Sequence, residues 1–267
     1  NAMNAKLDIS PIEAWLAVDG AGGNVEVRSP ASGESLGWLR QGGATEIANA
    51  SRSARKSQES WFAMPYEQRA AILYKAAQLV EENSKLYVEW LVRETGSVHA
   101  KAAFEVAIVA KVIREAAAMP SQPHGLVLPT QPGQLSFCRR MPLGVVGVIS
   151  PFNFPLYLAL RAVAPALAVG NAVVLKPDPR TTISSGLLVA RLFAAAGLPD
   201  GVLHVVPGAI EAGEAMCSDP NIAMIQFTGS TAAGRKIGAL AGGHLKKLSL
   251  ELGGKNSLIV LEDADLD

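Results

Sequence analysis

The sequence predicts an α/β fold in which a parallel sheet is covered by helices on both faces. Two observations lead to this prediction. From Gly144 onward, short and almost wholly apolar runs alternate with longer amphipathic stretches, as in parallel strands that are buried on both faces. The chain of 267 residues is also 49% hydrophobic and 18% charged, which is enough apolar material for a full core.

The first third of the chain is expected to be helical after a short β start. Polar and apolar residues alternate over 24–27 and predict a strand that ends at the turn Ser29-Pro30. Helix-forming residues then predict helices over 45–60, 66–83 and 99–119. Pro120 and Pro123 end the last of these helices.

A hairpin is predicted between the helical third and the sheet. Over residues 125–143, Leu126 and Leu128 lie on one side of a Pro- and Gly-containing turn, and Leu135 and Phe137 lie on the other. This pattern indicates two strands that stand away from the main sheet as a protruding β-hairpin arm.

The remainder of the chain reads as strand followed by helix, repeated four times. Strands are expected over 145–149, 172–175, 202–206 and 224–227, and helices over 156–169, 182–196, 210–217 and 231–241. A further strand ends at Glu251, and residues 257–261 have the pattern of another strand, for which this chain offers no sheet to join. Because such sheets bind ligands at the carboxyl ends of their strands, chemistry is expected in the loops that follow these strands.

The composition argues against two classes of partner. Basic and acidic residues balance at 24 each, so nothing in the charge indicates binding to nucleic acid or to an anionic membrane. The most apolar stretch is interrupted by Pro151, Pro155 and Pro165 and carries Arg161, which argues against a membrane span. The start of the chain, residues 1–3, resembles a remnant of tag removal, with the natural start at Met3.

The first two strand-end loops contain an amide and an amine. Asn153 lies between a strand and a helix that begins with proline, where its side chain could cap the helix or donate to a developing oxyanion. On spacing alone, helix capping is the more common of these two roles for Asn153. Lys176 directly follows an apolar strand, so it could bind a ribose or phosphate, or simply be solvated. Pro177 and Pro179 stiffen its turn.

The later loops contain glycines and a carboxylate. Gly229 and Ser230 open a helix and could offer N–H groups and a hydroxyl to a pyrophosphate. The fingerprint G-x-G-x-x-G is absent, so the glycines alone are weak evidence. Glu251 ends a strand before two glycines. Desolvation there would raise the pKa of its carboxyl group, as a general base requires, whereas pairing with a nearby lysine is an equally good interpretation.

Taken together and in order, four motifs resemble the aldehyde dehydrogenase superfamily. They are 151–155 (PFNFP), 176–177 (KP), 227–231 (FTGST) and 251–255 (ELGGK), and the end of the chain from residue 261 also fits the pattern. The resemblance covers nearly the whole chain. The run 176–180 is similar to members that act on benzaldehyde-type aldehydes, which indicates an aromatic substrate.

The resemblance implies NAD or NADP as cofactor, bound to a Rossmann-like domain, and implies no metal site. Asn153 would stabilise the oxyanion and Glu251 would activate the hydrolytic water. The implied cofactor-binding residues are Ile149, Ser150, Pro151, Phe152, Lys176, Pro177, Asp178, Gly208, Gly213, Phe227, Thr228, Gly229, Ser230, Ala233, Leu252 and Gly253. Many NAD-preferring members carry a glutamate where this chain has Pro179, so the choice between NAD and NADP stays open.

The resemblance also divides the chain. Residues 1–123 and 144–252 would form the cofactor-binding domain, and 124–143 an arm that bridges subunits of a homo-oligomer. Residues 253–267 would begin a catalytic domain that is otherwise absent.

The nucleophile of the family is a cysteine thiolate beyond the fourth motif, and residues 256–267 contain no cysteine. Cys138 falls in the arm and Cys217 in a short helix, and as unpaired thiols they fit a reduced cytoplasmic protein. We therefore expect the parent protein to oxidise a small aldehyde to a carboxylic acid, while this chain alone only binds cofactor. The alternative is a non-catalytic nucleotide-binding or interaction module.

Overall fold

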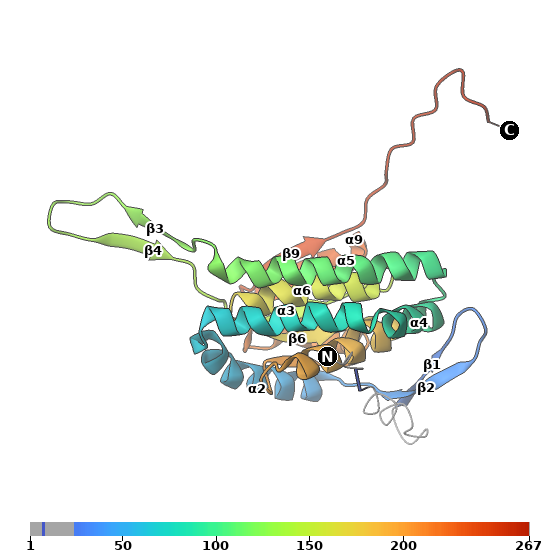
Figure 1. Ribbon diagram of the computed structural model, residues 1–267, viewed down its shortest axis with the longest axis horizontal. Helices are drawn as coiled ribbons and strands as arrows, with labels where there is room; N and C mark the ends of the chain where they lie inside the picture. The colour runs from blue at the N-terminus through green and yellow to red at the C-terminus, as the bar shows by residue number, and fades with distance from the viewer. Residues whose placement is uncertain (1–6, 9–23, 267) are drawn as a thin grey trace, which may run out of the picture.

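A five-stranded parallel sheet lies at the centre of the molecule (Figure 1). The computed structural model describes residues 7–8 and 24–266, so the tag remnant expected at residues 1–3 lies outside the described residues. The strands of the sheet are β5 (Val145–Ile149), β6 (Ala172–Lys176), β7 (Leu203–Val205), β8 (Ile222–Thr228) and β9 (Lys247–Glu251). These strands confirm the predicted α/β class and lie close to the predicted strand ranges.

The order of the strands across the sheet is β7-β6-β5-β8-β9. The chain therefore moves outward from β5 through β6 to β7, then returns to the other side of β5 for β8 and β9. Every residue of β5 and β6 is buried, which explains their nearly uninterrupted Val, Ile, Ala and Leu content. The reversal of direction falls between β5 and β8, where Ile149 pairs in register with Phe227.

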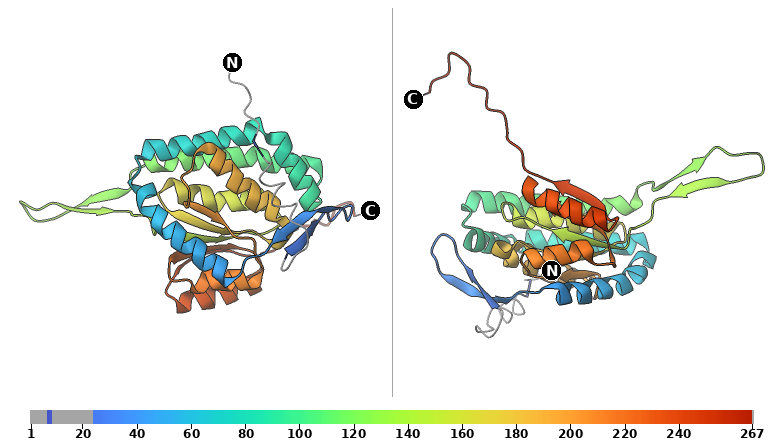
Figure 2. Two further views of the ribbon diagram at one scale, coloured as in Figure 1. Left: turned by 90° about the horizontal axis from the view of Figure 1, so that it is seen from below. Right: turned by 180° about the vertical axis from the view of Figure 1, so that it is seen from behind.

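Helices cover both faces of this sheet, as predicted (Figure 2). One face is covered by α6 (Pro155–Ala168) and α7 (Leu188–Ala196). The opposite face is covered by α2 (Ala44–Ala63), α8 (Ile210–Ser218) and α9 (Thr231–Gly243). Two short helical segments, η2 (Pro179–Thr181) and η3 (Ile183–Leu187), precede α7, so the helix expected over 182–196 begins with a π-helical turn.

A second layer of helices packs outside α6 and α7. It consists of α3 (Tyr66–Glu82), α4 (Ser84–Thr95) and α5 (His99–Ala118). Helix α4 was not predicted from the sequence. It buries Tyr87, Val88 and Leu91 on one side, and it ends at Gly96, whose φ of +68° places it in the left-handed region that favours glycine.

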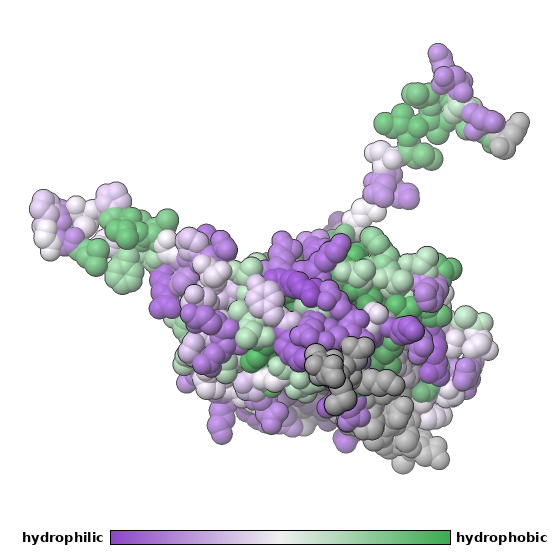
Figure 3. All heavy atoms as spheres, in the orientation of Figure 1, coloured by the Kyte–Doolittle hydropathy of each residue, from purple (hydrophilic) through white to green (hydrophobic). Residues whose placement is uncertain are grey.

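Two antiparallel ribbons lie outside the main sheet. The first pairs β1 (Asn24–Arg28) with β2 (Ser35–Arg40); it confirms the predicted β start and adds a second strand. The second pairs β3 (Gly125–Leu128) with β4 (Ser136–Arg139) after the short helix η1 (Met119–Ser121), and it is the predicted arm. It projects from the body with apolar side chains exposed, including Val127, Leu135 and Phe137 (Figures 1 and 3).

The strand pattern over 257–261 has no sheet to join, and the structure forms no strand there. β9 ends at Glu251, and residues 252–266 run away from the body without strand pairing (Figure 1). Leu258, Ile259 and Leu261 in this segment are exposed. A strand needs a hydrogen-bonded neighbour, and no strand of the described chain pairs with this segment, so its apolar pattern alone does not produce one.

Buried polar side chains fasten the helical layers to one another. The indole N–H of Trp61 on α2 donates to the Leu167 carbonyl at the end of α6 (2.9 Å), and Gln58 donates to the Gly170 carbonyl (2.8 Å). Arg69 on α3 is buried and donates to the carbonyls of Phe62 and Ala168. Such bonds satisfy carbonyls that the helix ends leave unpaired. Among the described residues, no helix combines the length and apolarity needed to cross a bilayer.

Glu94 joins the outer layer to the segment that follows β6. This carboxylate is fully buried on α4 and accepts hydrogen bonds from the backbone N–H groups of Ile183 (2.7 Å) and Ser184 (2.6 Å), and from the Ser184 hydroxyl. Burial raises the pKa of Glu94 to about 7, although these hydrogen bonds act in the opposite direction.

We expect this raised pKa to make the stability of the protein depend on pH. Because the folded state holds the proton more tightly than the unfolded chain, the contribution of Glu94 is fully present below about pH 4.5 and is lost as the pH rises to about 7. Between pH 5 and pH 7 the loss amounts to about 2 kcal/mol. Urea unfolding at pH 5 and pH 7 should show this fall in the wild type and a smaller fall in Glu94→Gln. The control Glu89→Gln changes an exposed carboxylate of the same helix and should behave like the wild type; an equal pH effect in both variants would contradict the assignment.

Candidate functional site

A cavity of about 570 Å³ lies at the carboxyl ends of β5, β6 and β8, where the strand order reverses. This is the place where open parallel sheets bind ligands. The cavity brings together most of the residues predicted to bind a cofactor. These are Ile149, Ser150, Pro151, Phe152, Lys176, Asp178, Gly213, Phe227, Thr228, Gly229, Ser230 and Ala233.

Four other predicted residues lie beside the cavity without lining it: Pro177, Gly208, Leu252 and Gly253. Gly208 packs tightly, because a Cβ atom at this position would come within 2.5 Å of the Ala212 side chain and 2.7 Å of the Gly42 carbonyl oxygen. Leu252 packs on α9, since a Cβ at Gly234 would lie 2.4 Å from its side chain. These residues therefore shape the elements around the cavity.

Lys176 is buried at the end of β6, with 6% of its surface exposed. Its ammonium group donates to the carbonyl oxygens of Pro177 and Gly208, each at 3.0 Å. Burial lowers its pKa, against the opposing effect of Asp178. The interpretation of Lys176 as a solvated lysine is therefore wrong. An ammonium has three donors, so one N–H remains available to a ligand in the cavity.

Asp178 and Arg180 form a bidentate ion pair at the edge of the same cavity. The guanidinium Nε and Nη2 atoms each lie 2.8 Å from a different carboxylate oxygen of Asp178. Burial alone would raise the pKa of Asp178, but the hydrogen bonds and charge of Arg180 outweigh it and lower the pKa. The guanidinium carbon also lies 3.6 Å from the centroid of the Phe152 ring, so the pair connects the loops after β5 and β6.

Ser230 begins helix α9 as predicted. Its hydroxyl oxygen caps the helix by accepting a hydrogen bond from the Ala233 N–H (3.2 Å). In the described chain, the N–H groups of Thr231 and Ala232 have no protein acceptor. Ser150, at the end of β5, lines the same cavity and has a buried hydroxyl without a hydrogen-bond partner among the described residues. The cavity therefore has polar groups that a bound ligand could satisfy.

Asn153 does not cap helix α6, so the expectation based on spacing alone is wrong. The residue that precedes the helix is Phe154, and Asn153 itself is exposed. The N–H groups of Leu156 and Tyr157 donate instead to Glu105 Oε1, at 2.9 and 3.1 Å. Glu105 comes from α5 and is fully buried, so a distant carboxylate fixes the start of α6 and leaves the Asn153 amide available.

Glu251 lies at the end of β9 with 52% of its side chain exposed. Its Oε1 atom pairs with Nη2 of Arg161 on α6 at 3.1 Å. The desolvation expected for a general base is therefore not present in the described chain, and the partner is an arginine instead of the lysine considered above. Glu251 is the last residue of β9 and Asn153 lies in the loop after β5, so both lie at the carboxyl ends of the parallel strands.

The two cysteines lie in different surroundings. Cys138 is exposed on the arm. Cys217 lines the cavity from α8, but burial raises the pKa of its thiol to about 11. A buried neutral thiol is a poor nucleophile at neutral pH.

Several cavity residues were not predicted from the sequence. They are Pro179, Arg180, Ala209, Ile210, Glu214, Ala232, Lys236, Ile237 and Leu240. Most of them belong to the faces of α8 and α9 that border the cavity. On α9 the cavity residues have helical spacing, at positions 233, 236, 237 and 240. This spacing could have indicated a helix face that borders the cavity, but ordinary packing of α9 on the sheet would produce the same pattern.

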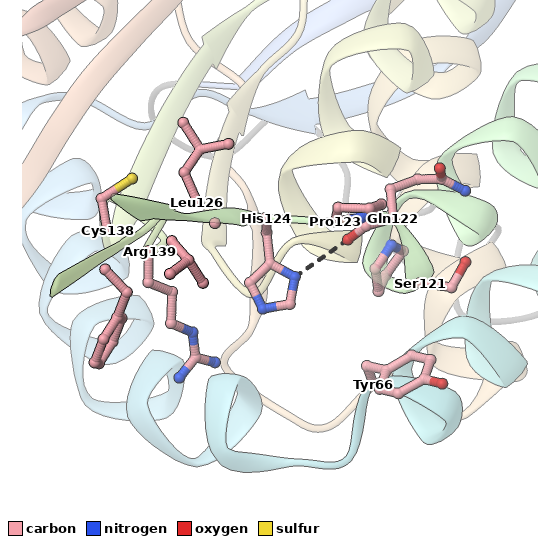
Figure 4. A pocket seen from close by; sticks show the side chains of 12 residues that line it. Tyr66, Ser121, Gln122, Pro123, His124, Leu126, Cys138 and Arg139 are labelled. Atoms are coloured by element: carbon pink, nitrogen blue, oxygen red, sulfur yellow. Dashed lines mark hydrogen bonds between the residues drawn. The ribbon is translucent and has the colours of Figure 1, made fainter. Parts of the chain in front are cut away.

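A second cavity of about 570 Å³ lies at the base of the arm (Figure 4). Tyr66, His124 and Arg139 border it, and His124 Nδ1 lies 3.2 Å from the Gln122 carbonyl oxygen. It is formed by residues of α3, η1, β3 and β4 and does not include the ends of the parallel strands. We therefore assign the candidate site to the cavity at the strand ends.

Comparisons with known proteins identify relatives of this chain. Residues 15–267 match the aldehyde dehydrogenase family. A vanillin dehydrogenase from Amycolatopsis sp. is 50% identical over 92% of this chain and 51% of the relative, and a benzaldehyde dehydrogenase [NAD(+)] from Pseudomonas putida is 47% identical over 94% and 52%. The crystal structure of an NAD-dependent benzaldehyde dehydrogenase from Corynebacterium glutamicum superposes with a TM-score of 0.84 at 41% identity, covering 88% of this chain and 52% of the other.

The chain thus spans about half the length of the curated relatives that it matches. The match extends over all four strand-end motifs and over the strands and helices that surround the cavity. The chain belongs to the aldehyde dehydrogenase family.

Proposed function

We propose that this chain is the cofactor-binding part of an enzyme that oxidises an aldehyde to a carboxylic acid, and that it binds NAD or NADP in the cavity at the strand ends. The observation that carries this proposal is the position of the cavity, at the reversal of strand order and among the loops after β5, β6 and β8. The similarity to vanillin and benzaldehyde dehydrogenases supports an aromatic aldehyde as the substrate of the whole protein.

The residues present fit a dinucleotide. The side chains of the cavity include three cations, Lys176, Arg180 and Lys236, and two carboxylates, Asp178 and Glu214. The excess of positive charge suits a pyrophosphate, and the start of α9 with the capped Ser230 adds N–H donors. Apolar side chains from α9 and β8 offer surfaces on which rings can pack.

The cofactor, when bound, accepts a hydride from the substrate. The chain supplies two groups for the chemistry around that transfer. Asn153 would donate its side-chain amide to the oxyanion, which is feasible because Glu105 already caps α6. Glu251 would accept a proton from water, and this role requires Arg161 to release it from their ion pair.

Two further expectations belong to the same proposal. The exposed apolar arm, β3 and β4, would pack against another subunit of a homo-oligomer, because isolated apolar ribbons of this kind favour association. The two unpaired cysteines fit a cytoplasmic location.

We expect Lys176→Met to weaken NAD binding by roughly tenfold, because the substitution removes a charged donor that the cavity presents. Titration calorimetry of the chain with NAD measures the change. Lys111→Met is the matched control, since Lys111 is exposed on α5, and it should bind like the wild type. Equal affinity in wild type and Lys176→Met, with both folded by circular dichroism, would argue against the cavity as the binding site.

The chain alone should bind cofactor without turning over an aldehyde. With benzaldehyde and NAD we expect no rise in absorbance from NADH, because Cys217 is a buried neutral thiol and Cys138 lies on the arm. If NADH did form and Cys217→Ser or Cys138→Ser abolished it, one of these cysteines would be the nucleophile and this part of the proposal would be wrong.

A further inference from the structure

The cavity at the base of the arm is separate from the strand-end cavity (Figure 4). No residue that lines it also lines the cavity at the strand ends. Its volume of about 570 Å³ falls within the range of sites that take small organic molecules. A ligand of this cavity would therefore bind independently of the proposed cofactor.

One cation of this cavity has no protein counter-ion. The guanidinium of Arg139 makes no hydrogen bond or ion pair within the described part of the chain. No Asp or Glu occurs among the described residues that line the cavity. The guanidinium carbon lies 5.9 Å from the centroid of the Phe62 ring on α2, and this contact holds the side chain against the body of the protein. The N–H donors of Arg139 are therefore available to an anion.

His124 adds a second polar group beside Arg139. Its Nδ1 atom lies 3.2 Å from the Gln122 carbonyl oxygen, which orients the ring and leaves Nε2 without a partner among the described residues. Figure 4 shows the side chains of Arg139 and His124 extending from the arm toward Tyr66, whereas the sulfur of Cys138 points the other way. The two polar side chains thus lie on the same side of the arm base, and the thiol does not.

The other walls of the cavity are largely apolar. They come from Tyr66, Pro120, Pro123, Leu126, Val127 and Phe137. Leu126, Val127 and Phe137 are exposed in this chain, so a ligand with an apolar body would gain free energy by covering them. The aromatic rings among these walls favour a flat, aromatic body, because rings pack well against one another.

We propose that this cavity binds a small aromatic carboxylate of the benzoate class. The carboxylate matches the planar fork of the Arg139 guanidinium in charge and in geometry, and the aromatic ring packs on the apolar walls. A phosphate fits less well, because the apolar walls would desolvate its additional charge without pairing it. This site goes beyond the proposed cofactor binding and does not depend on it.

Titration calorimetry of the full chain with benzoate tests the proposal, and the wild type should bind one benzoate per chain. Arg139→Gln should weaken binding by roughly tenfold or more, because it removes charge-assisted hydrogen bonds to the carboxylate. Arg139→Lys keeps the charge and loses the fork, so its affinity should be intermediate. Benzyl alcohol, which has the ring without the charge, should bind the wild type roughly tenfold more weakly than benzoate.

Arg140→Gln is the matched control, because Arg140 is the next residue of the arm, is exposed and does not line the cavity. It should bind benzoate like the wild type. Nuclear magnetic resonance gives the location independently. The ring signals of His124, identified among the four histidines by their loss in His124→Gln, should shift as benzoate is added.

The absence of saturable benzoate binding to the folded wild type at millimolar concentration would overturn the proposal, as would equal affinity in wild type and Arg139→Gln. An equal loss of affinity in Arg140→Gln would show a general effect of charge and overturn it too. Sedimentation velocity of the unliganded variants supplies the last check. If Arg139→Gln weakens binding only because a second copy then covers the arm, the assignment to Arg139 is wrong. The affinity for NAD enters none of these outcomes, so the proposed function is tested separately.

Discussion

The reversal of strand order between β5 and β8 is the constraint on which the site depends. Because β6 and β8 lie on opposite sides of β5, the connections that follow these strands leave toward different faces of the sheet, and a cavity remains at their carboxyl ends. The sheet itself is held by apolar burial on both faces. Strands hydrogen-bonded in fixed register place Ser150, Lys176 and Thr228 around the same space, although these residues are distant in the sequence.

Buried carboxylates then fix the backbone that surrounds this space. Glu105 accepts the first N–H groups of α6 and so holds the loop of Asn153, while Glu94 accepts the N–H groups of Ile183 and Ser184 and so holds the segment after Arg180. Both come from the outer helical layer, which does not itself line the cavity. The outer helices therefore hold two segments that follow strands of the sheet and border the cavity. In each case the desolvation of the carboxyl group raises its pKa, and the hydrogen bonds offset this effect only in part.

The sequence allowed prediction of the sheet, its helical cover and the arm, because parallel strands are short apolar runs and hairpins flank turn residues. Most of the predicted cavity residues followed instead from the resemblance to the aldehyde dehydrogenase superfamily. Other features carried no local signal. The burial of Lys176 and the capping of α6 by Glu105 depend on contacts between residues far apart in the chain. The face of α9 that includes Lys236 has the same spacing as ordinary helix packing. The apolar pattern over 257–261 forms no strand, as expected for a segment to which the described chain offers no partner.

The central proposal is that a dinucleotide occupies the cavity between the ends of β5 and β8. The most direct measurement is a crystal structure of the chain soaked with NAD. We expect electron density for the dinucleotide among Ser150, Lys176 and Ser230, with a phosphate near the start of α9. Density for NAD at another place, such as the cavity at the base of the arm, with the strand-end cavity left empty, would contradict it.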